Sequence, residues 1–130
     1  MDGMEGIMSQ SASEVTRIPP ERVKACIDAG ESIFILDVRP RRDDLQIPAS
    51  FWFDPTDLLK ADRILLSARK DQLIVTYDDA SDASLSSQVA EKLISQGYWN
   101  AHPLDGGIAA WRDQGLPIEP RPVETVIGTE

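Results

Sequence analysis

The sequence predicts an α/β fold of three layers, in which a central, mostly parallel sheet is flanked by helices on both faces. Two segments, Ser32–Arg39 and Leu73–Tyr77, are continuous apolar runs that are rich in strand formers and too short to be buried helices. They alternate with segments whose apolar residues recur at helical spacing, such as Ser84–Gln96. Because strands that alternate with helices form parallel sheets covered on both sides, this order indicates the α/β class.

The remaining elements follow from local start and stop signals. Pro20 near the first turn and Gly30 after the last residue delimit a helix over Glu21–Ala29. The other expected elements are a polar loop over Pro40–Asp44, a short strand over Ile47–Phe53, a helical segment that Asp54 caps and that includes Leu58 and Leu59, a second helical stretch over Arg63–Ala68, a strand over Asn100–Leu104, a turn at Gly106–Gly107 and a last helix over Ile108–Gln114.

Length and composition indicate one acidic globular domain. The chain has 130 residues, of which 42% are hydrophobic and 27% charged, enough for one hydrophobic core and too few for two ordinary domains. We expect a flexible leader over residues 1–15, the domain over 16–120 and a flexible tail over 121–130. The formal net charge of -9 argues against nucleic acid and anionic membrane surfaces as partners. It fits either a basic protein partner or an acidic surface that only keeps the domain soluble.

The cysteine content and the apolar runs bear on the compartment. Cys26 is the only cysteine, so neither an intramolecular disulfide nor a cysteine-based zinc site can form. The amino terminus lacks the basic residues and apolar core of a signal peptide, and no apolar run approaches the roughly 20 residues of a membrane helix. We therefore expect a reducing, cytoplasmic compartment and no direct membrane insertion.

Position in the fold singles out three loops as candidate sites. In parallel sheets, ligands bind at the carboxyl ends of the strands, in the loops that lead into helices. The loop after Arg39, the loop after Tyr77 and the turn at Asp105–Gly107 meet this condition.

Four segments carry a family resemblance. They are Ile35–Arg39, Ile47–Pro48, the strand, loop and helix around Asp78, and Leu104–Arg112 followed by Gly115–Pro117. In this order and spacing they resemble the rhodanese homology domain over about Ile18–Ile118. The resemblance implies that family's three-layer α/β fold. It also implies structural roles for Asp37, Arg39, Gly106, Gly107 and Trp111.

The resemblance implies an altered active-site loop. In the family, the loop after the central strand carries a cysteine that accepts sulfur, and loop N–H groups stabilise the charge on that sulfur. Asp78 stands at the cysteine position, and a shift of the alignment by a residue or two brings in Asp79 or Ala80 instead. Ile47-Pro-Ala-Ser50 also departs from the family's usual Ile-Pro-Gly-Ala. The candidate binding residues of this loop are Asp78, Asp79, Ala80, Ser81, Asp82, Ala83 and Ser84.

The Asp78 carboxylate has two interpretations. It either accepts hydrogen bonds from the loop N–H groups and fills the site with a built-in anion, or it is an ordinary helix cap or solvated loop residue. Asp78, Asp79 and Asp82 do not have the spacing of a calcium-binding loop, so we expect no metal. Phosphatase chemistry is disfavoured because residues 78–91 contain no Cys, Arg or Lys.

Four residues outside this loop have less specific interpretations. Cys26 lies on the apolar face of the first helix, which is typical of a buried, unreactive thiol. His102 has no nearby nucleophile to activate and is expected to be a packing or rim residue. Either Trp52 or Trp99 is expected to be partly exposed. An exposed aromatic can anchor a partner, whereas core packing is the alternative.

The sequence therefore predicts a catalytically inactive rhodanese-like domain with a binding or regulatory role, no catalytic residue and no cofactor. An acidic loop favours a protein partner or a basic peptide segment over thiosulfate as the ligand. The alternative is an active thiosulfate or persulfide sulfurtransferase that uses Cys26 or a thiol of a partner chain. A purely structural role within a larger protein cannot be separated from the first interpretation by the residues alone.

Overall fold

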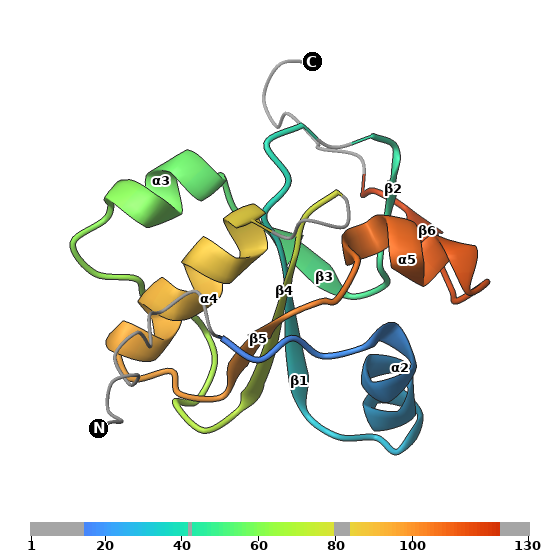
Figure 1. Ribbon diagram of the computed structural model, residues 1–130, viewed down its shortest axis with the longest axis horizontal. Coiled ribbons are helices and arrows are strands. Elements are labelled where there is room, and N and C mark those ends of the chain that lie inside the picture. Colours follow the sequence, from blue (N-terminus) through green and yellow to red (C-terminus); the bar gives the residue numbers. More distant parts are fainter. Residues whose placement is uncertain (1–14, 42, 80–83, 123–130) are drawn as a thin grey trace, which may run out of the picture.

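The computed structural model describes residues 15–41, 43–79 and 84–122 (Figure 1). Its central sheet has the strand order β3-β1-β4-β5. The strands are β1 (Ile33–Asp37), β3 (Ser50–Trp52), β4 (Leu73–Tyr77) and β5 (Ala101–Pro103). Every neighbouring pair is parallel, and Ile35 of β1 lies opposite both Ser50 and Val75. The expected central parallel sheet is confirmed.

Helices cover both faces of this sheet, as Figure 1 shows. α3 (Pro55–Lys60) and α4 (Ser84–Ser95) lie on one face, and α2 (Pro20–Asp28) and α5 (Gly107–Asp113) lie on the other. The helical segment after Asp54 is confirmed, because the Asp54 carboxylate accepts a hydrogen bond from Thr56 N at 2.8 Å and caps α3. None of the helices in the described residues is long and apolar enough to cross a bilayer. The three-layer α/β fold is therefore confirmed.

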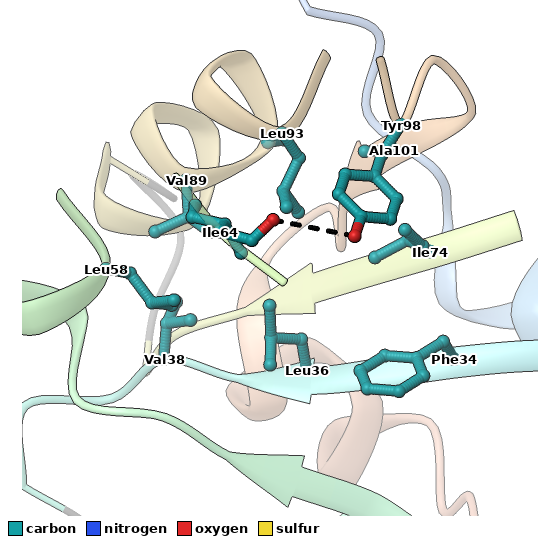
Figure 2. Close-up of a cluster of buried hydrophobic side chains, with 11 residues drawn as sticks. Phe34, Leu36, Val38, Leu58, Ile64, Ile74, Val89, Leu93, Tyr98 and Ala101 are labelled. Carbon is teal, nitrogen blue, oxygen red and sulfur yellow. Dashed lines mark hydrogen bonds between the residues drawn. The ribbon is translucent and has the colours of Figure 1, made fainter. Parts of the chain in front are cut away.

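Each face of the sheet has its own cluster of buried apolar side chains. Side chains alternate between the faces of a strand, so Phe34 and Leu36 of β1 face α3 and α4, whereas Ile35 faces α2 and α5. Figure 2 shows the first cluster, in which side chains of α4 pack over β1 and β4. Trp111 of α5 is fully buried in the second cluster, and its indole Nε1 donates a hydrogen bond to Pro117 O at 2.6 Å.

The expected helix over Arg63–Ala68 is wrong, because this segment has no regular secondary structure. Ile64 is buried while its neighbour Leu65 is 77% exposed. Its backbone groups are instead bonded by side chains from the end of α4 and the turn after it, which removes the need for helical hydrogen bonds.

Two further differences concern strands. β2 (Leu45–Gln46) and β6 (Glu119–Pro120) form a small antiparallel pair that the sequence did not suggest. The expected strand over Ile47–Phe53 is reduced to β3, and Ala49 has a left-handed backbone with φ 66°. The expected flexible leader and tail fall almost entirely on residues 1–14 and 123–130, which lie outside the described residues.

Candidate functional site

The candidate site lies at the carboxyl edge of the sheet, where β1, β4 and β5 end (Figure 1). Backbone hydrogen bonds tie the segments beyond these strands together. Ile108 N donates to Asp78 O at 3.0 Å, and Ala109 N donates to Asp79 O at 3.2 Å. The first turn of α5 thus holds the backbone of the loop that follows β4, as expected for loops at this edge of a parallel sheet.

Asp78 is buried, with 5% of its surface exposed. Its carboxylate Oδ2 accepts a hydrogen bond from Ser86 N at 3.1 Å. Ser86 is in the first turn of α4, where backbone N–H groups have no partner within the helix and the helix dipole favours negative charge. The carboxylate therefore lies where the start of a helix binds an anion.

Asp37 and Arg39 form a buried ion pair beside this loop, with 0% and 1% of their surfaces exposed. Arg39 Nε donates to Asp37 Oδ1 at 3.0 Å, and Arg39 NH2 donates to Asp37 Oδ2 at 2.8 Å, so the contact is bidentate. The same guanidinium donates to Leu45 O at 2.9 Å and to Asp43 Oδ1 at 3.3 Å. The pair therefore fixes the loop after β1 to the end of the strand.

A family model for the rhodanese-like domain matches residues 19–114. The chain belongs to the rhodanese-like domain family. The solution structure of the rhodanese-like domain of the Alr3790 protein from Anabaena is 31% identical, with 79% of this chain and 77% of that chain covered and a TM-score of 0.66. A protein from Rhodopseudomonas palustris, described as of unknown function and a possible tyrosine phosphatase, is 25% identical, with 92% and 96% covered and a TM-score of 0.66. No curated protein matches the chain.

Tyr77 and Asp43 belong to the site of this rhodanese-like domain and were missed from the sequence. The buried Tyr77 hydroxyl lies 3.0 Å from Ser50 Oγ and accepts from Ile47 N at 3.3 Å. Burial above all, with the charge of Asp37, raises the pKa of Tyr77. A tyrosine at the end of a buried strand needs a hydrogen-bond partner for its hydroxyl, and this requirement could have identified Tyr77 from the sequence. Asp43 follows Arg39 at i+4, and a hydrogen bond from Leu45 N lowers its pKa.

The rest of the acidic loop is described only in part. Asp79 is exposed, yet partial loss of hydration raises the pKa of its carboxyl. The Arg39 charge opposes that rise, and the charges of Asp37 and Asp43 add to it. Ser84 is the exposed first residue of α4. The candidate residues Ala80, Ser81, Asp82 and Ala83 lie outside the described residues. Elsewhere, in the described ranges, no three His, Cys, Asp or Glu side chains gather as a metal site.

The turn before α5 requires glycine. Gly106 has φ 78°, a conformation that side chains with a Cβ rarely adopt. A Cβ built there would also lie 2.4 Å from the Ala110 Cβ. This turn begins the helix whose first N–H groups hold the Asp78 loop, so the glycine pair acts on the site through the backbone.

Cys26 and His102 lie away from the Asp78 loop. Both line a cavity of about 320 Å³ together with Leu73 and Asn100. Leu73 is the first residue of β4 and Asn100 directly precedes β5, so this cavity lies at the amino edge of the sheet. Burial, followed by the hydrogen bond and charge of Glu31, raises the pKa of the Cys26 thiol, while Arg22 opposes the rise. A thiol with a raised pKa is a weak nucleophile at neutral pH.

Proposed function

We propose that this rhodanese-like domain does not transfer sulfur and instead has a binding or regulatory role. The observation that carries the proposal is the buried Asp78 carboxylate, which bonds to Ser86 N at the start of α4. A carboxylate cannot hold a labile sulfur atom, and a negative charge there repels a second anion such as thiosulfate.

The position of Cys26 supports the same proposal. An active enzyme of this chain alone would need its single thiol to reach the loop after β4. Cys26 instead lines a cavity at the opposite edge of the sheet, and its pKa is raised. Sulfurtransferase activity that uses Cys26 or a thiol of a partner chain is the alternative function, and it predicts that the wild-type chain is active once that thiol is supplied.

Phosphatase activity would be the function suggested by the description of the Rhodopseudomonas palustris protein. Phosphoryl transfer of that kind needs a nucleophile and a cation beside the transferred group. Residues 78–91 contain neither cysteine nor a basic residue. We therefore do not assign that activity to this chain.

The proposed ligand is a basic segment of a cytoplasmic partner protein. Asp79 lies exposed beside the site, Asp43 exposes 56% of its side chain there and Asp105 exposes 57% of its side chain in the turn before α5. Two of these carboxylates, Asp43 and Asp105, pair with Arg112 and Arg17 across the surface at 3.5 Å, and the acidic rim that the three residues form complements Lys and Arg side chains of a partner.

A thiosulfate:cyanide sulfurtransferase assay tests the loss of activity. Wild type, Asp78→Cys and Cys26→Ala are compared, with thiocyanate as the measured product. In the Asp78→Cys variant, the new thiolate would take the outer sulfur of thiosulfate, release sulfite and pass the sulfur to cyanide. We expect no thiocyanate from the wild type and turnover by Asp78→Cys. Wild-type turnover that disappears in Cys26→Ala would refute the proposal and make Cys26 the sulfur carrier.

A charge-reversal experiment tests the ligand. The probe is a short Arg-rich peptide, titrated into the ¹⁵N-labelled domain and followed by amide chemical shifts. Asp79→Lys with Asp105→Lys should abolish the shifts at the carboxyl edge, because both changes remove negative charge there. Glu21→Lys with Asp113→Lys makes the same change of charge on exposed residues of α2 and α5 and is the matched control. Equal weakening by both pairs would mean that only net charge matters.

A further inference from the structure

A second surface, at the amino edge of the sheet, is built from the irregular segment over residues 61–68. The Gln96 side chain holds this segment from the end of α4, since its Oε1 accepts from Ile64 N at 2.6 Å and its Nε2 donates to Asp62 O at 3.2 Å. The Tyr98 hydroxyl accepts from Leu66 N at 3.0 Å. Figure 2 shows Tyr98 directed at Ile64, whose side chain is buried under α4.

A lysine fixes the start of the same segment. Lys92 of α4 donates hydrogen bonds to the carbonyl oxygens of Leu58 and Leu59 at 2.8 and 2.9 Å, and also to that of Ala61. These are carbonyls at the end of α3, which a helix leaves without partners. The segment is thus held at several points although it has no regular secondary structure. A surface that is already ordered loses little conformational entropy on binding.

This rigid segment and the turn after α4 present apolar side chains to solvent. Leu65 is 77% exposed and Trp99 is 61% exposed, the two highest values for large apolar side chains in the described part of the chain. Trp99 N donates to Lys70 O at 3.2 Å, which places the tryptophan beside Lys70. Next to them is a hollow of about 430 Å³ lined by Asp62, Arg63, Ile64, Leu65, Lys70 and Gln96. We call these lining residues and Trp99 the Leu65–Trp99 surface.

The charge of this region is opposite to that of the whole chain. Residues 60–72 contain four basic side chains and two acidic ones, whereas the chain has 13 basic and 22 acidic residues. One of the two acids, Asp71, is paired with Arg69 at 3.0 Å. The Lys70 ammonium lies 4.6 Å from the centre of the Tyr98 ring and donates to Gln96 O, so its charge is held at the hollow.

We propose that the Leu65–Trp99 surface binds an acidic partner segment that inserts an apolar side chain into the hollow beside Leu65. Exposed tryptophan and a basic residue next to a preformed hollow are the features that anchor protein partners. The positive charge selects an acidic segment, because like charges across an interface are repelled. A hollow accepts a side chain, which a lipid surface does not supply. This surface is independent of the Asp78 loop, which lies at the other edge of the sheet.

Amide chemical shifts and tryptophan emission test the proposal on the full chain. The probe is a short acetylated peptide in which Glu residues flank a Phe and a Leu, and the same peptide with Gln in place of Glu is the neutral control. We expect shifts at Leu65, Lys70, Gln96 and Trp99, a blue shift of the emission, and weaker binding at high salt. The emission change should be absent in Trp99→Phe. No shift at these residues at about 1 mM peptide would overturn the proposal.

Matched variants separate a specific surface from net charge. Arg63→Glu should weaken binding about tenfold, because it reverses a charge at the hollow. Arg41→Glu makes the same change on an exposed arginine near the carboxyl edge and should leave binding unchanged. Equal weakening by both variants would overturn the proposal. The proposal would also be overturned if phosphatidylserine vesicles changed the amide shifts of Leu65 and Trp99 and the peptide did not, because that result would indicate a membrane contact. Shifts that depend on protein concentration alone would indicate a second copy of the chain.

Discussion

The buried ion pair between Asp37 and Arg39 offers the most direct test of what holds the candidate site together. Asp37→Asn keeps the size of the side chain and removes its charge. The Arg39 guanidinium, 1% exposed, then stays buried with Leu45 O and the exposed Asp43 carboxylate as acceptors, and the buried negative charge that balanced it is gone. Breaking a buried pair by removal of one partner costs about 3–5 kcal/mol, because an uncompensated charge remains. That cost is a large part of the roughly 5–15 kcal/mol that stabilises a domain of this size.

Two further variants make the test independent of complete unfolding. Arg39→Lys keeps the positive charge but cannot donate to both Asp37 oxygens in the planar geometry seen here, so we expect a loss of about 1–3 kcal/mol. The double variant Asp37→Leu with Arg39→Leu removes both charges and should cost less than the single variants Asp37→Leu and Arg39→Leu added together.

Urea unfolding at pH 7, followed by far-ultraviolet circular dichroism and tryptophan emission, measures these changes. Trp111 is fully buried and reports loss of the second core cluster. A loss below about 1 kcal/mol for Asp37→Asn, or strictly additive effects in the double variant, would refute the reasoning, because either result means that the pair carries no coupling energy.

Three other changes have expected outcomes. Since the pKa of Tyr77 is raised in the folded state, its proton is lost first from the unfolded chain, and stability should fall as pH rises past about 10. When urea unfolding is measured between about pH 8 and about pH 11, the free energy of unfolding of Tyr77→Phe should lack this part of the decrease. A pH profile identical to that of the wild type would contradict the prediction. Ala49→Gly should raise the free energy of unfolding by about 1 kcal/mol. A backbone with φ 66° costs a residue with a Cβ roughly 1–2 kcal/mol, and the greater conformational entropy of glycine in the unfolded chain offsets part of the gain from removing that strain. A lower urea midpoint would refute this. Asp78→Cys should lose about 1 kcal/mol by removing the acceptor for Ser86 N, and Asp78→Asn should lose less because its amide oxygen still accepts. The reverse order in urea unfolding would rule out the capping role.

Elements with a strong apolar pattern could be predicted from the sequence. β1 and β4 are buried on both faces, so their composition differs from that of the helices in the described ranges. The order of strands and helices then sufficed for the three layers and for the edge at which Asp37, Asp78 and Gly106 meet. The shared edge followed from topology alone, because the carboxyl ends of parallel strands lie at the same edge of a sheet.

What could not be predicted depends on contacts between distant residues. The segment after α3 has apolar residues at a spacing that suits a helix, but Gln96 and Tyr98 bond its backbone from more than 30 residues away. The pair of β2 and β6 joins segments that are far apart in the sequence, and each strand has only two residues, too few for any pattern. Tyr77 and Asp43 were missed for the same reason, since their partners are fixed only by the fold.

The loop around Asp78 shows how the site can keep its shape without a thiol. Its side chain bonds to the first turn of α4, and the carbonyls of Asp78 and Asp79 accept from the first turn of α5. Two helix starts, each with N–H groups that need acceptors, thus meet one short segment. In the proposed inactive domain, the carboxylate supplies the negative charge that these N–H groups and the helix dipole favour, so the anion site is filled from within. The carboxylate thus takes the place of a bound anion in the proposed inactive domain, and the acidic side chains of Asp43, Asp79 and Asp105 lie exposed beside it.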